Sequence, residues 1–585
     1  MQTLFWNGPR EEKPRKKIGC LGKILIAIGI YVLLSVLSYW WMMSFSSQPT
    51  VLEDNAVYKI AMKGSLVERA AEENPFASLL GTLPTYNQQE TVGLDQLLSN
   101  IRLAKEDSRV EGIWLDGGEL AMAPASAKTL RDALADFKAS GKWVIAYAQR
   151  YGELNYYVAS IADAIYLNPV GSVEWHGFGA FKMYYTRLLE KLGVEMQVVK
   201  VGTFKSAVEP FIRTSMSEAD RRQTKQYVQG LWDQVVAEVG AARGLSPDEL
   251  NRYADEYMEL QPQDKYLAYK MVDSLVYVQE MDSIVAHMIG TSDFHCYSTG
   301  AMANVERAKV KATDKIAILY ADGEISDESG DGIVGTKMVK TITKIHKDES
   351  VKAVVLRVNS PGGSADASEQ IWHAVQTLKQ KGLPVVVSMG DYAASGGYYI
   401  SCGADYIFAE PTTITGSIGI FGLIPNAGVL RDKIGIDIDA LGTNKHTSFS
   451  AGLGLRGMTG SERAMMQKMV ERGYDLFTSR CAQGRHMPQD EIKKIGEGRV
   501  WLGKDALELG LVDELGNIEM AIAKAADLAG LTDYKKVAFP EKKDYWTEMM
   551  EALDPTTDEE KMLLKLRELC KEARVMMLAP QVTIQ

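Results

Sequence analysis

The chain contains one unit of sequence twice, and this duplication limits its possible folds more than any other feature. Five pairs of segments match in the same order: 59–66 with 315–325, 110–117 with 351–358, 155–169 with 397–411, 202–205 with 442–445, and 271–275 with 511–515. Tyr156 and Tyr157 are matched 242 residues later by Tyr398 and Tyr399. Since 585 residues also exceed the roughly 250 to 300 that one hydrophobic core supports, we expect two large domains built alike.

Each copy alternates short β-branched runs with helical patterns, which is typical of an α/β domain with mostly parallel strands. In the second copy the pattern predicts strands at 315–320, 353–358, 384–389 and 406–409, and helices near 366–381 and 396–403. Long amphipathic helices are predicted at 217–243 and 461–482, and a charged helix at 557–575. The segment 297–312 has no clear period, and we expect it to link the copies.

Residues 24–43 form an uncharged apolar run of 20, which as a helix matches a hydrocarbon core about 30 Å thick. Basic residues precede this run and acidic residues follow it, so the positive-inside rule leaves residues 1–23 in the cytoplasm. A cleaved signal peptide is the alternative, but its apolar core is typically about 7 to 15 residues and the small-x-small site at 44–46 is poor. We therefore expect an uncleaved transmembrane anchor, with the rest of the chain outside the cytoplasm.

The composition argues against several classes of function. A net charge of -11, with no cluster of Lys and Arg in the body of the chain, argues against a nucleic-acid partner. The five cysteines lie far apart and form no C-x-x-C pair, so neither a disulfide framework nor a zinc site is indicated. We expect no metal and no cofactor.

Two glycine loops of the second copy carry the residues best suited to chemistry. The first predicted loop is Ser-Pro-Gly-Gly at 360–363, where two glycines present bare N–H groups of the kind that an oxyanion hole needs. The second is Ala-Ser-Gly-Gly at 394–397, which puts the hydroxyl of Ser395 at the N-terminus of a predicted helix. Taken singly, each loop has a plainer interpretation, an ordinary turn and a helix N-cap.

Comparison of the two copies separates these interpretations. Ser395 corresponds to Glu153 at the offset of 242, and the region that matches Pro-Gly-Gly reads Gly-Glu-Leu-Ala-Met-Ala-Pro at 118–124. A feature required only for folding would occur in both copies. Since the first copy retains the fold signals and lacks both loops, we interpret the loops as functional and Ser395 as the candidate nucleophile.

A serine requires a base to act as a nucleophile at neutral pH. None of the seven histidines lies beside either glycine loop or within 40 residues after Ser395, although a Ser-His-Asp triad with remote partners stays an alternative. Lysine is the other choice, because burial lowers its pKa by up to about 3 to 5 units and yields a neutral amine.

At this point the motifs resemble those of the signal peptide peptidase A family, also called protease IV. They are Ser-Pro-Gly-Gly at 360–363, Gly-Asp-x-Ala-Ala-Ser-Gly-Gly-Tyr-Tyr at 390–399, Thr-Gly-Ser-Ile-Gly-Ile-Phe-Gly at 415–422 and Gly-Thr-Phe-Lys-Ser-Ala-Val-Glu-Pro-Phe at 202–211. The resemblance covers nearly the whole chain, including the anchor and the duplication. It implies a serine protease with a Ser-Lys dyad, built from two tandem Clp-protease/crotonase-like α/β domains after an N-terminal transmembrane helix.

The resemblance also implies roles for individual residues. They are the nucleophile Ser395, the base Lys205, the supporting hydroxyl of Ser417, and the oxyanion donors Gly396 and either Gly362 or Gly363. In this arrangement the first copy, at 50–300, supplies the lysine, and the second copy, at 312–585, supplies the serine and ends in a helix.

Lys445 is the alternative base, because short, unduplicated members of the family draw their base from this position of the second copy. Apolar residues flank Lys205 within 204–211 and would lower its pKa by covering the amine. Lys445 instead has polar neighbours at 443–448, which would keep its amine solvated and charged. The local sequence therefore favours Lys205.

The resemblance further implies a homotetramer that degrades signal peptides left in the membrane. The expected partners are apolar peptides, the lipid bilayer and further copies of this chain, and the expected location is the bacterial inner membrane with periplasmic catalytic domains. Two other classes of function stay open. One is a crotonase-like acyl-CoA enzyme, which would need cytoplasmic CoA, and the other is a non-catalytic membrane scaffold on a peptidase fold.

Overall fold

The computed structural model describes residues 29–31, 33–35, 37, 49–70, 90–307, 311–330, 332–542, 575–578 and 583–584. The segment 1–23, much of the predicted anchor at 24–43 and nearly all of the predicted helix at 557–575 lie outside these residues. Among the residues that are described, we find no helix with both the length and the apolar character that a bilayer crossing requires.

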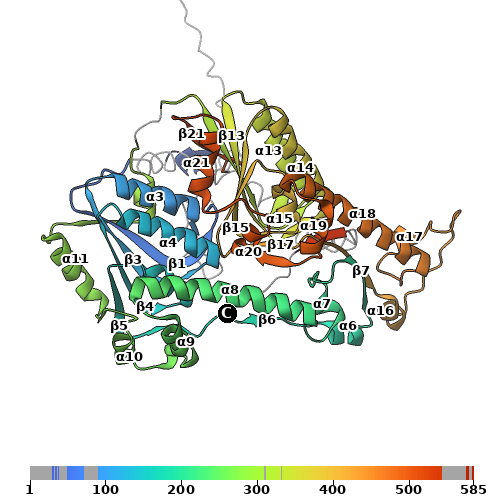
Figure 1. Cartoon of the computed structure of the whole chain (residues 1–585), viewed down its shortest axis with the longest axis horizontal. Helices are drawn as coiled ribbons and strands as arrows, with labels where there is room; N and C mark the ends of the chain where they lie inside the picture. Colours follow the sequence, from blue (N-terminus) through green and yellow to red (C-terminus); the bar gives the residue numbers. More distant parts are fainter. Residues whose placement is uncertain are drawn as a thin grey trace, which may run out of the picture. The chain divides into compact units, whose positions relative to one another are not determined.

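The first copy folds around a parallel sheet, whose strands run from blue to green in Figure 1. Its strands are β1 (Ala56–Val67), β2 (Thr91–Gly93), β3 (Val110–Ala121), β4 (Trp143–Tyr151), β5 (Ala164–Val173), β8 (Ser274–Leu275) and β9 (His295–Tyr297). They pair in the order β2-β1-β3-β4-β5-β8, with β9 also on β1, and every pair is parallel. The helices α3 (Leu94–Glu106) and α4 (Pro124–Lys138) pack against each other beside this sheet.

The second copy repeats this plan. Its strands are β10 (Lys315–Asp322), β13 (Val351–Ser360), β15 (Val385–Ala394), β16 (Tyr406–Ala409), β17 (Ile414–Gly416), β19 (Val500–Leu502), β20 (Glu514–Leu515) and β21 (Lys535–Phe539). Their order is β19-β17-β15-β13-β10-β21, with β16 on β15 and β20 on β16, and all pairs are parallel except β17 with β19. The four predicted strands are confirmed as β10, β13, β15 and β16, and the two predicted helices as α14 (Ala365–Gln380) and α15 (Gly396–Ser401).

The apolar, β-branched composition of the central strands explains their position. Residues 353–356 of β13 and 385–387 of β15 have no exposed surface. Parallel strands of this kind are continuously apolar because the connecting helices cover both faces of the sheet. The last matched pair of segments also occupies equivalent places, since β8 pairs with β5 as β20 pairs with β16.

A further sheet combines strands from both copies, in the order β12-β11-β14-β22-β18-β7. These strands are β7 (Glu195–Val201), β11 (Ile325–Ser326), β12 (Ile333–Val334), β14 (Gly362–Ser364), β18 (Ile420–Asn426) and β22 (Val575–Leu578). The first-copy strand β7 runs antiparallel to the second-copy strand β18, from Glu195 opposite Asn426 to Val201 opposite Ile420. Residues that follow β7 therefore meet residues that precede β18.

The long helices predicted at 217–243 and 461–482 are α8 (Glu218–Arg243) and α18 (Gly460–Arg485). Figure 1 shows α8 running alongside both copies. This helix contacts α5 (Glu153–Ala159) of the first copy and β19 of the second copy. Other described helices are α6 (Thr186–Leu192), α7 (Glu209–Ile212), α9 (Pro247–Asp255), α10 (Gln263–Ala268), α11 (Met281–Ile289), α13 (Gly335–Lys347), α16 (Gly428–Lys433), α17 (Phe449–Gly452), α19 (Gln489–Ile495), α20 (Gly503–Glu508) and α21 (Ile518–Leu528).

Buried polar contacts join the two copies. Arg357 on β13 donates to both carboxylate oxygens of Glu68, the residue after β1, at 2.9 and 2.8 Å. Asp391 on β15 accepts the N–H groups of Ala125 and Ser126 at the start of α4, at 2.9 and 2.8 Å. Removing one partner of either contact would leave a buried charge or an uncapped helix end, so the copies stabilise each other.

The described residues before Glu53 form a compact unit of their own together with Gly300–Arg307. Within this unit the N–H of Thr50 donates to the carbonyl of Asn304 at 3.0 Å, and Thr50 pairs in parallel with Val305. Part of the predicted linker at 297–312 therefore has regular structure, including the short helix α12 (Thr299–Ala303).

Candidate active site

Ser395 stands at the turn between β15 and α15 in a backbone conformation that few residues adopt. Its φ is 57° and its ψ is -115°, and its side chain has no exposed surface. The N–H of Ser395 donates to the carbonyl of Gly416 at 2.8 Å, which holds the turn against the strand β17. A positive φ in a non-glycine residue costs about 1–3 kcal/mol and is common where a strand-to-helix turn presents a nucleophile.

The glycine after Ser395 lets this turn approach the Pro-Gly-Gly loop. A β-carbon on Gly396 would lie 2.7 Å from Oγ of Ser368 and 3.1 Å from the nitrogen of Gly363. A side chain at Gly396 would therefore push the loop away from the start of α15. The close approach brings two of the predicted oxyanion donors, Gly363 and Gly396, into contact.

The two glycines of the Pro-Gly-Gly loop differ in their surroundings. The N–H of Gly362 donates to Oγ of Ser360 at 3.2 Å, so this donor already has a partner inside the loop. Gly363 has a φ of 153°, and a β-carbon there would lie 2.0 Å from the carbonyl oxygen of Ile325. Gly363 is itself paired with Ile325 and Met577 in the sheet, so which of the two glycines donates to an oxyanion stays a prediction.

Lys205 reaches Ser395 from the first copy. Lys205 lies shortly after β7. Because β7 pairs with β18, Lys205 comes to lie beside the residues that precede β18. Its Nζ lies 2.8 Å from Oγ of Ser395, 3.0 Å from Oγ of Ser417 and 3.2 Å from the carbonyl oxygen of Ser417. The structure thus brings together Ser395, Lys205 and Ser417, three residues that the sequence had singled out far apart in the chain.

The surroundings of Lys205 favour its neutral form. The side chain has no exposed surface, and this burial lowers the pKa of the amine well below its ordinary value. A neutral amine carries two N–H donors and one lone pair. The two donors match the two oxygens of Ser417, and the lone pair is left to accept the hydroxyl proton of Ser395.

A turn at 497–499, which the sequence analysis missed, holds Ser417 and Lys205 in place. The N–H of Ser417 donates to the carbonyl of Arg499 at 2.7 Å, and the N–H of Phe204 donates to the carbonyl of Glu497 at 2.9 Å. A β-carbon on Gly498 would lie 2.7 Å from the β-carbon of Lys205, so only glycine permits this contact. The Gly-Glu-Gly sequence at 496–498 was the signal that could have pointed to this turn.

Comparison with known proteins adds a decisive observation. Two segments of the chain, 136–288 and 377–532, match the family model described as Peptidase family S49. The chain belongs to peptidase family S49. A model described as Clp protease also matches residues 308–414, in agreement with two S49/Clp-like α/β domains.

Relatives of this S49 peptidase extend over most of its length. Protease 4 of Haemophilus influenzae is 35% identical over 507 residues, covering 83% of this chain and 81% of the relative. Protease 4 of Salmonella typhi is 37% identical over 509 residues, covering 84% of this chain and 79% of the relative. Serine protease SPPA, chloroplastic, of Arabidopsis thaliana is 28% identical over 468 residues, covering 77% and 68%.

The resemblance to signal peptide peptidase A is therefore confirmed, in the long form. The chain is a serine protease of family S49, and this assignment sets aside the acyl-CoA enzyme and the non-catalytic scaffold.

Lys445, the alternative base, lies in a different environment in this S49 peptidase. It is exposed, and none of the residues 434–448 around it forms a strand. In the first copy the matching segment after α6 forms β7 and pairs with β18, whereas the segment after α16 in the second copy has no such partner. Burial, which lowers the pKa of Lys205, is thus absent at Lys445.

The first copy holds a carboxylate where the second copy holds Ser395. Glu153 starts α5, and its Oε1 accepts the N–H groups of His176 and Gly177 at 2.9 and 2.8 Å. These bonds fix the loop after β5. A carboxylate at this position offers no hydroxyl to act as a nucleophile. In the described part of the chain no histidine contacts the side chain of Ser395, whose hydrogen-bond partner is Lys205.

A strand from late in the chain lies beside the Pro-Gly-Gly loop. β22 pairs antiparallel with β14 on one side, with Met577 opposite Gly363, and antiparallel with β18 on the other side, with Met576 opposite Phe421. Nζ of Lys205 lies 5.9 Å from the ring centre of Phe421, so β22 pairs with β18 next to the candidate dyad. β14 and β18 thus accept an extended peptide between them.

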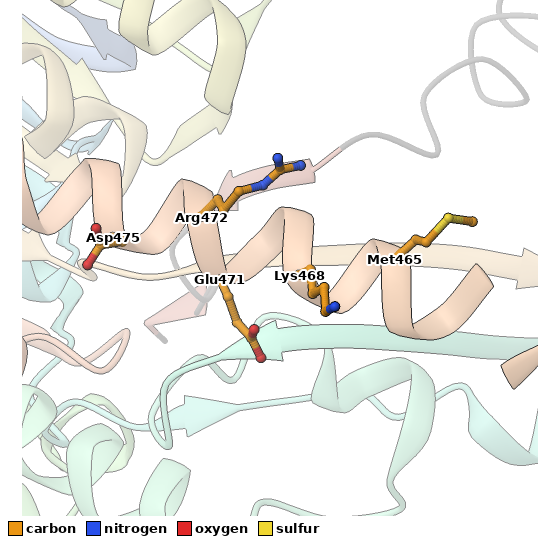
Figure 2. Close-up of a pocket in the computed structure, with 5 residues that line it drawn as sticks. All are labelled: Met465, Lys468, Glu471, Arg472 and Asp475. Atoms are coloured by element: carbon orange, nitrogen blue, oxygen red, sulfur yellow. The ribbon is translucent and has the colours of Figure 1, made fainter. Parts of the chain in front are cut away.

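A separate hollow on α18, of about 690 Å3, has a different character. Figure 2 shows that its lining side chains, Met465, Lys468, Glu471, Arg472 and Asp475, leave the helix in different directions. Opposite charges alternate along it, and it contains no hydroxyl or thiol side chain. Neither Ser395 nor Lys205 lines this hollow, which is therefore not part of the candidate active site.

Proposed function

We propose that this S49 peptidase is a membrane-anchored serine endopeptidase with a Ser-Lys dyad, in which Ser395 is the nucleophile and Lys205 the base. The observation that carries the proposal is the 2.8 Å separation between Nζ of Lys205 and Oγ of Ser395. Because burial lowers the pKa of the amine, its lone pair is free to take the hydroxyl proton at a lower pH than that of a solvated lysine.

In the acylation step, Oγ of Ser395 attacks the carbonyl carbon of the scissile peptide bond while its proton passes to Nζ of Lys205. The carbonyl oxygen becomes an oxyanion, to which the N–H groups of Gly363 and Gly396 donate. Collapse of this intermediate breaks the C–N bond, and the amine leaves with the proton from Lys205. The lysine then deprotonates a water molecule, which attacks the acyl-enzyme and releases Ser395.

The proposed substrates are residual signal peptides and other apolar peptides. Support comes from the predicted anchor at 24–43, which would hold the enzyme at a bilayer, and from the family resemblance. To test this, the purified full chain is given Leu- and Ala-rich peptides and, separately, charged unfolded chains of equal length. We expect a higher kcat/KM for the apolar peptides, and a much higher value for the charged chains would refute the proposal.

The position between β14 and β18 that β22 occupies in the sheet is the proposed substrate site. Main-chain pairing of a peptide with both strands would give affinity that depends little on its side chains. It would also lay the scissile bond beside Gly363. The segment Val575–Leu578 already pairs in this way, so it would act as an internal competitor of the substrate.

Met576→Pro is expected to lower KM for a short apolar peptide by about 2- to 10-fold, with kcat nearly unchanged. Met576 lies opposite a residue of β14 and a residue of β18, so its N–H donates to one of these two strands. Proline removes this donor and weakens the pairing of β22 with its neighbouring strands by about 0.5–1.5 kcal/mol. A substrate peptide could then take the place of β22 more often. Steady-state kinetics measures the change.

The matched control is Met576→Leu, which retains the backbone N–H and should keep the KM of the unaltered chain. An unchanged KM in the proline variant would mean that Val575–Leu578 does not compete with substrate.

The proposal also includes the location and the assembly of the enzyme. The anchor at 24–43 would place residues 1–23 in the cytoplasm and the two copies, 50–300 and 312–585, in the periplasm against the bacterial inner membrane. Four chains would form the active assembly, as the family resemblance implies. Protease protection in intact spheroplasts tests the location, and the native mass in detergent tests the assembly.

A further inference from the structure

One buried amide connects the loop that carries Lys205 to the second copy. Gln223 lies on α8 and is 1% exposed. Its Nε2 donates to the carbonyl of Phe204 at 3.0 Å and to Oγ of Ser206 at 2.9 Å, and its Oε1 accepts the N–H of Val500 at 3.4 Å. The catalytic steps described above do not use this residue.

The partners of Gln223 lie directly beside the reacting groups. Phe204 and Ser206 are the residues on either side of Lys205. Val500 follows Arg499, whose carbonyl accepts the N–H of Ser417. A single side chain therefore ties the backbone around the base to the backbone that holds the hydroxyl beside the base.

The chemistry of these contacts requires an amide. The carbonyl of Phe204 needs a donor and the N–H of Val500 needs an acceptor, so the two ends of the Gln223 side chain must have opposite character. Asp220, one turn earlier on α8, also accepts from Nε2 at 3.2 Å, and its carboxylate pairs with Lys182 at 2.8 Å. These contacts fix the orientation of the amide.

The same contacts help to exclude water from the amine of Lys205. The guanidinium of Arg499 lies 5.0 Å from the ring centre of Phe204 and covers the loop from the second copy. Burial is the cause of the low pKa of Lys205. The charged residues on the elements around this loop include Lys200, whose Nζ donates to the carbonyl of Lys205 at 3.3 Å, and Arg222, whose guanidinium lies 5.9 Å from the ring centre of Phe204. The others are Glu209, Asp220, Glu497 and Arg499. A looser loop would admit water to the amine and favour its charged form.

We propose that Gln223 is a positioning residue for Lys205, which fixes the loop of the base against β19 so that the amine stays in contact with Ser395 and away from water. This inference rests on the proposed role of Lys205 as the base. It assigns a function beyond packing to α8, which contacts elements of both copies.

The test is Gln223→Met in the full chain, which keeps the side-chain volume and removes the hydrogen bonds of the amide to Phe204, Ser206, Asp220 and Val500. We expect kcat to fall by about 10- to 100-fold, because small displacements of a catalytic group are costly, with KM little changed. We also expect the acid limb of the pH-rate profile to move to higher pH, because the solvated amine must lose its proton at a higher pH. The matched control is Gln229→Met on the same helix, because Gln229 is exposed and bonds only within α8, to Asp233.

A kcat and an acid limb like those of the unaltered chain would overturn the inference, and so would a lower kcat with an unmoved acid limb, since that is a general structural loss. If Gln223→Met fails to fold, Gln223→Glu retains the volume and the acceptor for Val500 and should shift the acid limb in the same direction. Lys205→Met is assayed alongside. Activity in Lys205→Met would refute the assignment of Lys205 as the base. Loss of activity in Lys205→Met with no effect of Gln223→Met would refute the positioning role of Gln223 alone.

Discussion

Lys205→Met is expected to lower kcat by about 10³- to 10⁶-fold, the range seen when one member of a catalytic unit is removed. Methionine keeps the volume of the side-chain stem and removes the amine that would accept the proton of Ser395. The variant should remain folded, because a buried amine is replaced by a thioether that needs no hydrogen bond. Single-turnover hydrolysis of an apolar peptide gives the rate of the chemical step.

Lys445→Met is the matched control for this experiment. Lys445 is exposed and sits in a segment without strand pairing, so we expect its replacement to change kcat little. The reverse pattern, a large loss at Lys445 and none at Lys205, would move the base into the second copy and leave the first copy with a structural role.

The same lysine should determine how activity depends on pH. Only the neutral amine accepts a proton, so activity should rise with pH through the folded-state pKa of Lys205, which burial lowers well below its ordinary value. The free energy of unfolding should also increase with pH. Between the lowered folded-state pKa and the unfolded value of about 10.4, the unfolded chain binds the extra proton, so raising the pH stabilises the folded state. Lys205→Met should lose this dependence, as urea unfolding at several pH values would measure.

Ser395→Ala should reduce peptide hydrolysis to the background and abolish covalent labelling by a serine-directed fluorophosphonate probe. The hydroxyl is buried and hydrogen-bonded to Lys205, so its loss should also lower the free energy of unfolding by about 1–3 kcal/mol. Thermal unfolding checks that the variant is folded, and mass spectrometry of the labelled native protein maps the adduct.

Ser401→Ala is the control for Ser395. Ser401 is a second buried serine of α15, and its Oγ donates to the carbonyl of Gly397 at 2.7 Å. It should keep both hydrolysis and labelling. Retained turnover in Ser395→Ala, or an adduct on another serine, would refute the assignment of the nucleophile.

The strands and helices around the candidate nucleophile were predictable because they depend on local sequence. Runs such as Val385–Val387 are typical of parallel strands that are buried on both faces, and the glycines after Ser395 mark a turn that packs closely. The duplication added a second, independent signal. Comparison of the two copies distinguished loops that occur once from strands and helices that occur twice. A chain with one copy would offer no such comparison.

The environment of Lys205 was predictable only in part. The expectation that its apolar sequence neighbours cover the amine is incomplete, because the ring of Phe211 stacks on Tyr185 and the ring of Phe421, from the second copy, lies 5.9 Å from the amine. Pairing between β7 and β18 joins residues more than 200 positions apart, and no local pattern specifies it. The contacts of Gln223 depend on the same long-range arrangement.

The pairing of β7 with β18 has a consequence for the evolution of the duplicated chain. With Lys205 as the proposed base, the position of Lys445 would be released from catalysis, and the position of Glu153 would be released from holding a nucleophile. Each half would then be free to change at the site that the other half supplies. Deletion of either half should abolish activity, so selection would act on the two copies as one unit.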